Sequence, residues 1–118
     1  MVIKVSDNRI EYLLMDDKKR DLVLILPGGG YERTSPREAK PVALACHKYG
    51  MHAAIFWYRE SKLTYPLLNY EGHSFLTNLN HHPSVNRLFI LGFSAGGHYA
   101  LMLSILYPNL IDKTILAY

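Results

Sequence analysis

The fold of this chain is decided by one stretch of sequence, Leu88-Phe89-Ile90-Leu91-Gly92-Phe93-Ser94-Ala95-Gly96-Gly97-His98. A short apolar run, typical of a buried strand, ends at Gly92, and a segment with helical character follows from Ala95 to Tyr107. Between them lies the pattern Gly-x-Ser-x-Gly. In the order strand, sharp turn, helix, this pattern predicts a turn that lifts the Ser94 hydroxyl above the end of the strand.

The two outer glycines of this pattern have a steric role. We expect a side chain at Gly92 or Gly96 to collide with the neighbouring strand or helix. The N-terminus of the helix then directs backbone N–H groups at negative charge that develops beside Ser94. The alternative is a glycine-rich strand-to-helix turn with an incidental serine, and the strand and helix patterns on either side favour a nucleophile.

A second glycine-rich turn supports this interpretation. The apolar run Leu22–Leu26 is typical of another buried strand, and it opens into Pro27-Gly28-Gly29-Gly30-Tyr31. Acyl transfer develops an oxyanion on the attacked carbonyl, and backbone N–H groups must approach it closely. Consecutive glycines after a strand allow that approach. Many tight turns contain such glycines, so the signal is specific only in combination with Gly-x-Ser-x-Gly.

Four segments together carry a resemblance to a known family: Leu26–Tyr31, Ser35–Ala39, Pro41–Ala43 and Gly92–His98. With them the chain resembles the N-terminal part of an α/β-hydrolase of the bacterial esterase/lipase type. It is most similar to the branch with acetyl-esterase and acetyl-xylan-esterase-like proteins. The resemblance runs from about Glu11 to the last residue.

The resemblance implies a serine carboxylic-ester hydrolase that acts on small-molecule esters, with small acyl groups on sugars or alcohols, and needs no cofactor or metal. Ser94 would be the nucleophile, and Gly29, Gly30 and Ala95 would supply the amides of the oxyanion hole. Pro27 stands where the family pattern His-Gly-Gly-Gly has a histidine. Three residues that follow strand ends are candidates to line the substrate entrance, or else ordinary surface residues: Tyr31, Arg33 and Tyr58.

The acid and the base of the expected catalytic triad are harder to place. In this family an Asp or Glu and then a His follow the serine, on loops after further strands. After Ser94 the sequence has one acidic residue, Asp112, and one histidine, His98. Asp112 precedes the apolar run Lys113–Tyr118, which puts it at the N-terminal end of a parallel strand, away from the serine. We therefore expect residues 1–118 to form a single incomplete α/β-hydrolase domain, without the C-terminal strands and the acid and base loops.

Two alternatives to the catalytic N-terminal portion of an esterase remain open. One is a non-catalytic truncated hydrolase, since loss of a triad residue costs about 10⁴–10⁶ in turnover. A peptidase or an arylformamidase-type hydrolase shares the same serine turn and differs only in its substrate.

The histidines are expected to have other roles than that of the base. His98 lies one helical turn after Ser94, and we expect it to be packed and locally hydrogen-bonded. His73, His81 and His82 are expected to lie far from the serine, and the last two have no Cys or carboxylate that completes a metal site.

A second pair of histidines flanks the expected helix end at Tyr49-Gly50. We expect His47 and His52 to interact with the last carbonyls of that helix.

Composition excludes several classes of protein. The 118 residues carry a net charge of +3, and the basic run Lys18–Arg20 is bracketed by Asp16, Asp17 and Asp21, which indicates a charged turn and not a nucleic-acid patch. The single cysteine, Cys46, cannot form an internal disulfide. It shares a helical face with Val42, Ala45 and Tyr49, which predicts core packing.

The start of the chain lacks a signal peptide's apolar run and no segment spans a membrane, so we expect a cytoplasmic protein without membrane partners.

Strand and helix patterns alternate along the chain. Expected strands are Met1–Val5, Ile10–Met15, Leu22–Leu26, His52–Tyr58, Arg87–Leu91 and Lys113–Tyr118, the first two as a hairpin around Ser6–Asn8. The first expected helix starts at the capping box Ser35–Glu38, has a kink or restart at Pro41 and ends at Gly50. Two more helices are expected over Pro66–Asn80 and Ala95–Tyr107.

This alternation predicts a truncated α/β-hydrolase fold. It is a mostly parallel sheet of about six strands, with an antiparallel first hairpin and flanking helices. The last strand, Lys113–Tyr118, would be an exposed apolar edge, which favours pairing with another chain. We therefore expect a marginally stable or homo-oligomeric protein.

Overall fold

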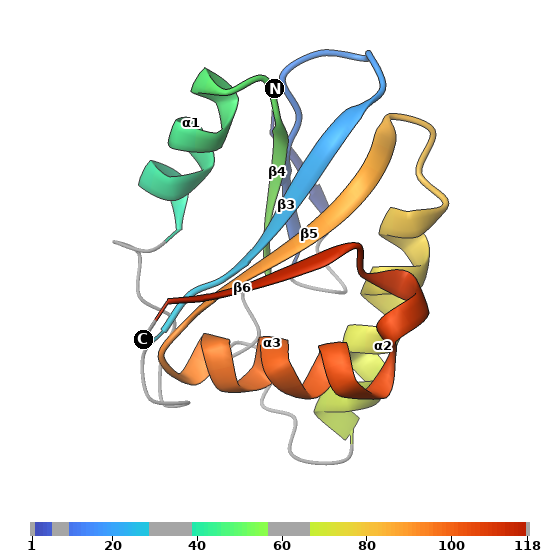
Figure 1. The fold of residues 1–118 in the computed structure, drawn as a ribbon. Coiled ribbons are helices and arrows are strands. Elements are labelled where there is room, and N and C mark those ends of the chain that lie inside the picture. The colour runs from blue at the N-terminus through green and yellow to red at the C-terminus, as the bar shows by residue number, and fades with distance from the viewer. Residues whose placement is uncertain (1, 6–9, 29–38, 57–66, 118) are drawn as a thin grey trace.

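Six strands form one sheet in the computed structural model, which describes residues 2–5, 10–28, 39–56 and 67–117 (Figure 1). The strand order is β1-β2-β4-β3-β5-β6. The strands are β1 (Val2–Val5), β2 (Ile10–Leu13), β3 (Arg20–Leu26), β4 (His52–Phe56), β5 (Val85–Phe93) and β6 (Lys113–Ala117). The helices are α1 (Lys40–Lys48), α2 (Leu67–Asn80), α3 (Ala95–Leu106) and a short 3-10 turn, η4 (Pro108–Leu110).

The pairing of the strands confirms the predicted fold class. β1 pairs antiparallel with β2, and β2 pairs antiparallel with β4. From β4 through β3 and β5 to β6 every pairing is parallel. The carboxyl ends of four parallel strands therefore meet at one edge of the sheet, which is where open α/β sheets place their ligands.

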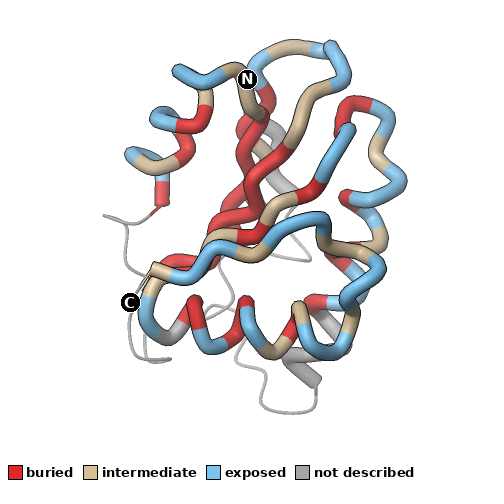
Figure 2. Tube along the Cα trace, viewed as in Figure 1, coloured by how far each residue is buried: buried red, intermediate tan, exposed pale blue. Residues whose placement is uncertain are grey.

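Alternate side chains of the central strands build a core on each face of the sheet. On one face, residues such as Leu22, Leu24 and Leu26 of β3 pack under α2 and α3. On the other face, Val23 and Ile25 of the same strand pack under α1. All five residues of β4 are buried, which explains its continuous apolar sequence (Figure 2).

The ends of helix α1 follow from a proline and a glycine. Pro41 lies in the first turn of α1, where the N–H that proline lacks would have no partner within the helix. The helix therefore starts at this proline, in agreement with the restart predicted there. The expected capping box 35–38 lies outside the described residues. At the other end Gly50 has a φ of 76°, a left-handed conformation that suits glycine and stops the helix as predicted.

Cys46 is buried in the core, as predicted, but the predicted helical face is partly wrong. Ala45 and Tyr49 are exposed, and Tyr49 is 82% accessible. The buried face of α1 consists of Ala43 and Cys46, one turn apart along the helix. The spacing of residues around Cys46 does not determine which way the helix is rotated about its axis. The packing of Ala43 against the sheet determines that rotation.

The prediction for His47 and His52 is wrong. Nε2 of His47 lies 2.7 Å from the carbonyl oxygen of Leu13, on β2 and not on the helix. His52 is fully buried; its Nδ1 accepts the N–H of Met15 at 3.1 Å and its Nε2 donates to the Lys18 carbonyl at 2.8 Å. The ring of His47 thus links α1 to the end of β2, and the ring of His52 links β4 to the charged turn that follows β2.

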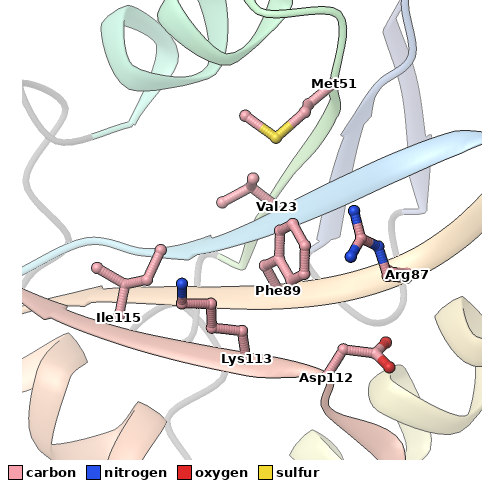
Figure 3. A pocket seen from close by; sticks show the side chains of 7 residues that line it. All are labelled: Val23, Met51, Arg87, Phe89, Asp112, Lys113 and Ile115. Atoms are coloured by element: carbon pink, nitrogen blue, oxygen red, sulfur yellow. The ribbon is translucent and has the colours of Figure 1, made fainter.

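β6 is the outermost described strand on its side of the sheet, as predicted. Ile115 is 42% and Leu116 is 49% accessible. Beside α1, this part of the sheet forms a depression (Figure 3), lined by Val23, Met51, Arg87, Phe89, Asp112, Lys113 and Ile115.

Among the described helices, none is both long and apolar enough to cross a membrane.

Candidate active site

Ser94 occupies the turn between β5 and α3. Its φ is 53°, and it is the only non-glycine residue with a positive φ in the described part of the chain. The Ser94 N–H donates to the carbonyl of Ala117 in β6 at 3.2 Å, and its carbonyl accepts the first helical bond, from the His98 N–H, at 3.0 Å. Ser94 is exposed, so a strained backbone presents this residue at the surface.

The two flanking glycines permit the turn for the reason predicted from the sequence. A Cβ added to Gly92 would meet the carbonyl oxygen of Gly96 and would lie 2.6 Å from the Cα of Gly97. A Cβ added to Gly96 would meet the carbonyl of Leu26 and would lie 2.7 Å from the oxygen of Pro27. All these neighbours are backbone atoms, which cannot rotate away.

The contact of Gly96 also brings the two glycine-rich turns together. β3 and β5 are parallel neighbours with Leu26 opposite Gly92, so the two strands end at the same edge of the sheet. Gly96 packs directly on the Leu26–Pro27 backbone, immediately before Gly28. The start of the triple-glycine segment and the first turn of α3 therefore lie against each other.

Ala95 begins helix α3 directly after the serine. The amides of a first helical turn have no carbonyl partner within the helix, and they carry the positive end of the helix dipole. The Ala95 N–H therefore lies at the positive end of the dipole of α3, next to Ser94 in the sequence. Five other candidate residues lie outside the described residues: Gly29, Gly30, Tyr31, Arg33 and Tyr58.

Asp112 lies at the opposite end of the sheet from Ser94. Its Oδ2 accepts the N–H of Leu88 at 2.7 Å, and its own N–H donates to the Leu88 carbonyl at 2.8 Å. These bonds fasten the N-terminal end of β6 to β5. The prediction that Asp112 lies at the N-terminal end of a parallel strand is confirmed.

The remaining histidines also have structural neighbours. The ring of His73 lies 4.6 Å from that of Tyr107, and the ring of His82 lies 6.0 Å from that of Tyr12. Nδ1 of His81 lies 2.8 Å from the Thr77 carbonyl oxygen. His98 is exposed on α3, so the expectation that it is packed is wrong.

No group of His, Cys, Asp and Glu side chains among the described residues has the arrangement of a metal site. What the described part of the site can offer to a substrate is a serine hydroxyl and backbone amides. This set of groups suits nucleophilic attack on a carbonyl and stabilisation of an oxyanion.

Comparison with known proteins gives a consistent result, although no family model matches the chain. Among curated proteins, endo-1,4-beta-xylanase B of Butyrivibrio fibrisolvens is 29% identical over 115 residues, which cover 90% of this chain and 18% of the xylanase.

Three of the solved structures that resemble the chain are hydrolases. An α/β-hydrolase enzyme from a Medee basin deep-sea metagenome library is 30% identical, with a TM-score of 0.79, over 88% of this chain and 50% of its own. An acetyl ester-xyloside bifunctional hydrolase from Caldicellulosiruptor lactoaceticus is 26% identical, with a TM-score of 0.69, over 75% of this chain and 35% of its own. A lipase/esterase from Lactobacillus plantarum is 22% identical, with a TM-score of 0.74, over 98% of this chain and 57% of its own.

The chain thus spans about half the length, or less, of these solved structures. Their strand and helix arrangement is the one found here, and the strained serine between β5 and α3 has the geometry predicted from Gly-x-Ser-x-Gly. By strand order and structural similarity, the chain has the N-terminal part of an α/β-hydrolase fold.

Proposed function

We propose that Ser94 is the nucleophile of a serine carboxylic-ester hydrolase. The observation that carries this proposal is the positive φ of Ser94 on an exposed turn whose next glycine, Gly96, packs on the Leu26–Pro27 backbone. A residue is held in such a conformation only where the surrounding structure enforces it, and such residues cluster at functional sites.

The proposed reaction has two stages. The Ser94 Oγ attacks the ester carbonyl carbon, and a general base takes its proton, while the amides of Gly29, Gly30 and Ala95 bind the oxyanion. The tetrahedral intermediate collapses, the C–O bond to the alcohol breaks, and the proton goes to the leaving alcohol. Water then attacks the acyl-enzyme and releases the carboxylic acid and the free serine.

The proposal assigns the nucleophile and the oxyanion donors to these 118 residues, but it assigns no acid or base. Asp112 is fixed to Leu88 at the far end of β5, and His98 lies on the same helix that begins after Ser94. A catalytic acid and base at the carboxyl edge must therefore come from other residues than these two.

Small-acyl esters of carbohydrates or simple alcohols are the proposed substrates. Support comes from the acetyl ester-xyloside hydrolase, the lipase/esterase and the xylanase among the similar proteins. Tyr31, Arg33 and Tyr58 are the proposed substrate contacts, since each follows the carboxyl end of a strand in the sequence.

The test is ester hydrolysis by the protein expressed from its complete gene, with p-nitrophenyl acetate and acetylated xylooligosaccharides as substrates. Ser94→Ala is expected to lower kcat about 10⁴–10⁶-fold. Ser104→Ala, the same substitution within helix α3, is the control and is expected to leave kcat unchanged. Hydrolysis that survives Ser94→Ala, or a wild-type protein that cleaves neither ester, would contradict the proposal. Cleavage of peptides or formylated arylamines in place of esters would favour the two related hydrolase classes.

A further inference from the structure

Asp112 satisfies both backbone groups of one residue on the neighbouring strand. Its Oδ2 accepts the Leu88 N–H at 2.7 Å, and its own N–H donates to the Leu88 carbonyl at 2.8 Å. The first bond is charge-assisted, because a carboxylate accepts it, and such bonds are roughly twice as strong as neutral ones. Asp112 directly precedes β6 (Figure 3), so this double attachment holds the start of that strand against β5.

β6 has little else in the described structure to hold it in place. None of its five residues is buried, whereas the last five residues of β3 are all buried. Strands with few buried apolar contacts and exposed hydrogen bonds open locally at a low cost in free energy. The hydroxyl of Thr114 contacts that of Ser104, but this contact ties β6 to α3 and not to β5. The pairing of β6 with β5 therefore depends mainly on backbone hydrogen bonds and on the Asp112 side chain.

The other end of β6 holds the turn of Ser94. Phe93 pairs with Ala117, and the Ala117 carbonyl accepts the Ser94 N–H at 3.2 Å. Ser94 has a φ of 53°, a conformation that persists only where the surrounding structure enforces it. The bond to Ala117 is a direct restraint on this strained backbone, and opening of β6 removes it while α3 and β3 stay in place.

We infer that Asp112 is a positioning residue for Ser94. By its two bonds to Leu88 it keeps β6 paired with β5, and the paired strand holds the Ser94 N–H through the Ala117 carbonyl. The inference rests on the proposed function, because it gives Asp112 a part in the reaction of Ser94. Asp112 acts through the strand and touches no substrate, in agreement with its place at the opposite end of β6 from Ala117.

The test compares variants of the protein expressed from its complete gene. Asp112→Ala removes the acceptor of the Leu88 N–H, and Asp112→Asn keeps an oxygen acceptor without the charge. Asp21→Ala is the matched control. Oδ1 of Asp21 also accepts a backbone N–H of β5, from Arg87 at 3.1 Å, but this bond joins β5 to β3.

Four quantities are measured for each variant. They are kcat and KM for p-nitrophenyl acetate, the midpoint of urea unfolding, and the hydrogen-exchange rate of the Ser94 amide, followed by NMR. The exchange rate reports the bond from Ser94 to Ala117 directly and needs no substrate.

Asp112→Ala is expected to raise the exchange rate of the Ser94 amide about 10-fold, the effect of losing about one hydrogen bond. It is expected to lower kcat about 10-fold with KM unchanged, because a small displacement of the nucleophile has a cost of this size. Asp112→Asn should recover most of both losses, which an effect of charge alone would not allow. Asp21→Ala is expected to lower the urea midpoint but to leave kcat and the Ser94 exchange rate unchanged.

Asp112 is exposed, so its variants are expected to fold. If Asp112→Ala does not fold, Asp112→Glu decides, since it keeps the charge but moves the carboxylate oxygens away from the Leu88 N–H. It is expected to give the same two losses.

Three results would overturn the inference. The first is a kcat or a Ser94 exchange rate that the substitution of Asp112 leaves unchanged. The second is an equal change in Asp21→Ala, and the third is an Asp112→Asn variant as impaired as Asp112→Ala. Failure of the proposed function is a different result, because the wild-type protein then shows no hydrolysis that depends on Ser94.

Discussion

At the scale of single residues, the strain at Ser94 is maintained by the absence of side chains on both sides of it. A positive φ is unfavourable for serine, and the turn keeps it only while α3 packs closely on β3 and β5. Gly92 and Gly96 make this close packing possible, because each faces backbone atoms. The same contact places the helix N-terminus beside the segment that begins at Gly28.

Gly96→Ala is predicted to destabilise the protein by about 1–3 kcal/mol or more, because a Cβ there overlaps the Leu26 carbonyl and forces the helix and strand apart. Gly72→Ala is the matched control. Its Cβ would also be crowded, at 2.5 Å from Leu103 Cδ2 and 2.8 Å from the Tyr99 hydroxyl, but these are side-chain atoms that can move. Equilibrium urea unfolding gives both values, and an equal or smaller cost for Gly96→Ala would contradict this account.

The sequence predicted the glycine contacts but failed for the histidines. Gly-x-Ser-x-Gly is a local pattern, and its steric demands act within the turn that it forms. His52 bonds to the Met15 N–H and the Lys18 carbonyl, far away in the sequence, and so does His47 to Leu13. Only the tertiary arrangement of β2 beside β4 brings these partners together, so neighbours in the sequence gave the wrong partners.

At the scale of elements, one ion pair holds the charged turn between β2 and β3, and a second joins the N-terminal ends of β3 and β5. Arg20 donates to both oxygens of Asp16, at 3.0 and 2.9 Å, and Arg87 donates to both oxygens of Asp21, at 3.2 and 2.8 Å. The hydrogen bond from Arg20 is the main cause that lowers the pKa of Asp16 from 3.8 to about 2. The hydrogen bond from Arg87 likewise lowers the pKa of Asp21.

These shifts predict a loss of stability in acid. A carboxyl group with a lower pKa in the folded state stabilises the protein above its unfolded pKa of 3.8, and this contribution is lost as the pH falls towards about 2. The thermal midpoint, followed by circular dichroism at constant ionic strength, is therefore expected to fall between these pH values. In the double variant Asp16→Asn, Asp21→Asn the fall should be shallower, and an unchanged slope would contradict the assignment.

Element types were predictable because their patterns are local and strong. All six strands were predicted from apolar runs, and the observed boundaries differ by a few residues, as at β2, which ends at Leu13 and not at Met15. The rotation of α1 was less predictable. Small residues such as Ala45 fit either a core or a surface position, and the sheet decides between them.

At the scale of the whole molecule, the two sides of the sheet are unequally covered. α1 lies over β3 and β4, while Phe89 of β5 and Ile115 of β6 line the depression beside it (Figure 3). On the α3 helix Ile105 is 65% accessible, and Leu116 of β6 is 49% accessible. Apolar side chains and a strand edge exposed together favour association with other polypeptide.

The 118-residue chain expressed by itself is predicted to self-associate through β6. Leu116→Lys combined with Ile115→Lys should lower the association, because charges on an edge strand oppose pairing. Leu44→Lys on α1, where Leu44 is 61% accessible, is the control for a general effect of added charge. Sedimentation velocity over a range of concentrations measures the change. A monomeric wild-type chain, or equal effects of both sets of substitutions, would contradict the prediction.

The central claim, that Ser94 is a nucleophile beside an oxyanion hole, is tested most directly by a crystal structure of the protein after reaction with a fluorophosphonate. The account predicts a covalent bond from Ser94 Oγ to phosphorus. It also predicts a phosphoryl oxygen at about 2.7–3.1 Å from the Ala95 amide and from an amide of Gly29 or Gly30. A label on another residue, or a phosphoryl oxygen that points away from these amides, would contradict the claim.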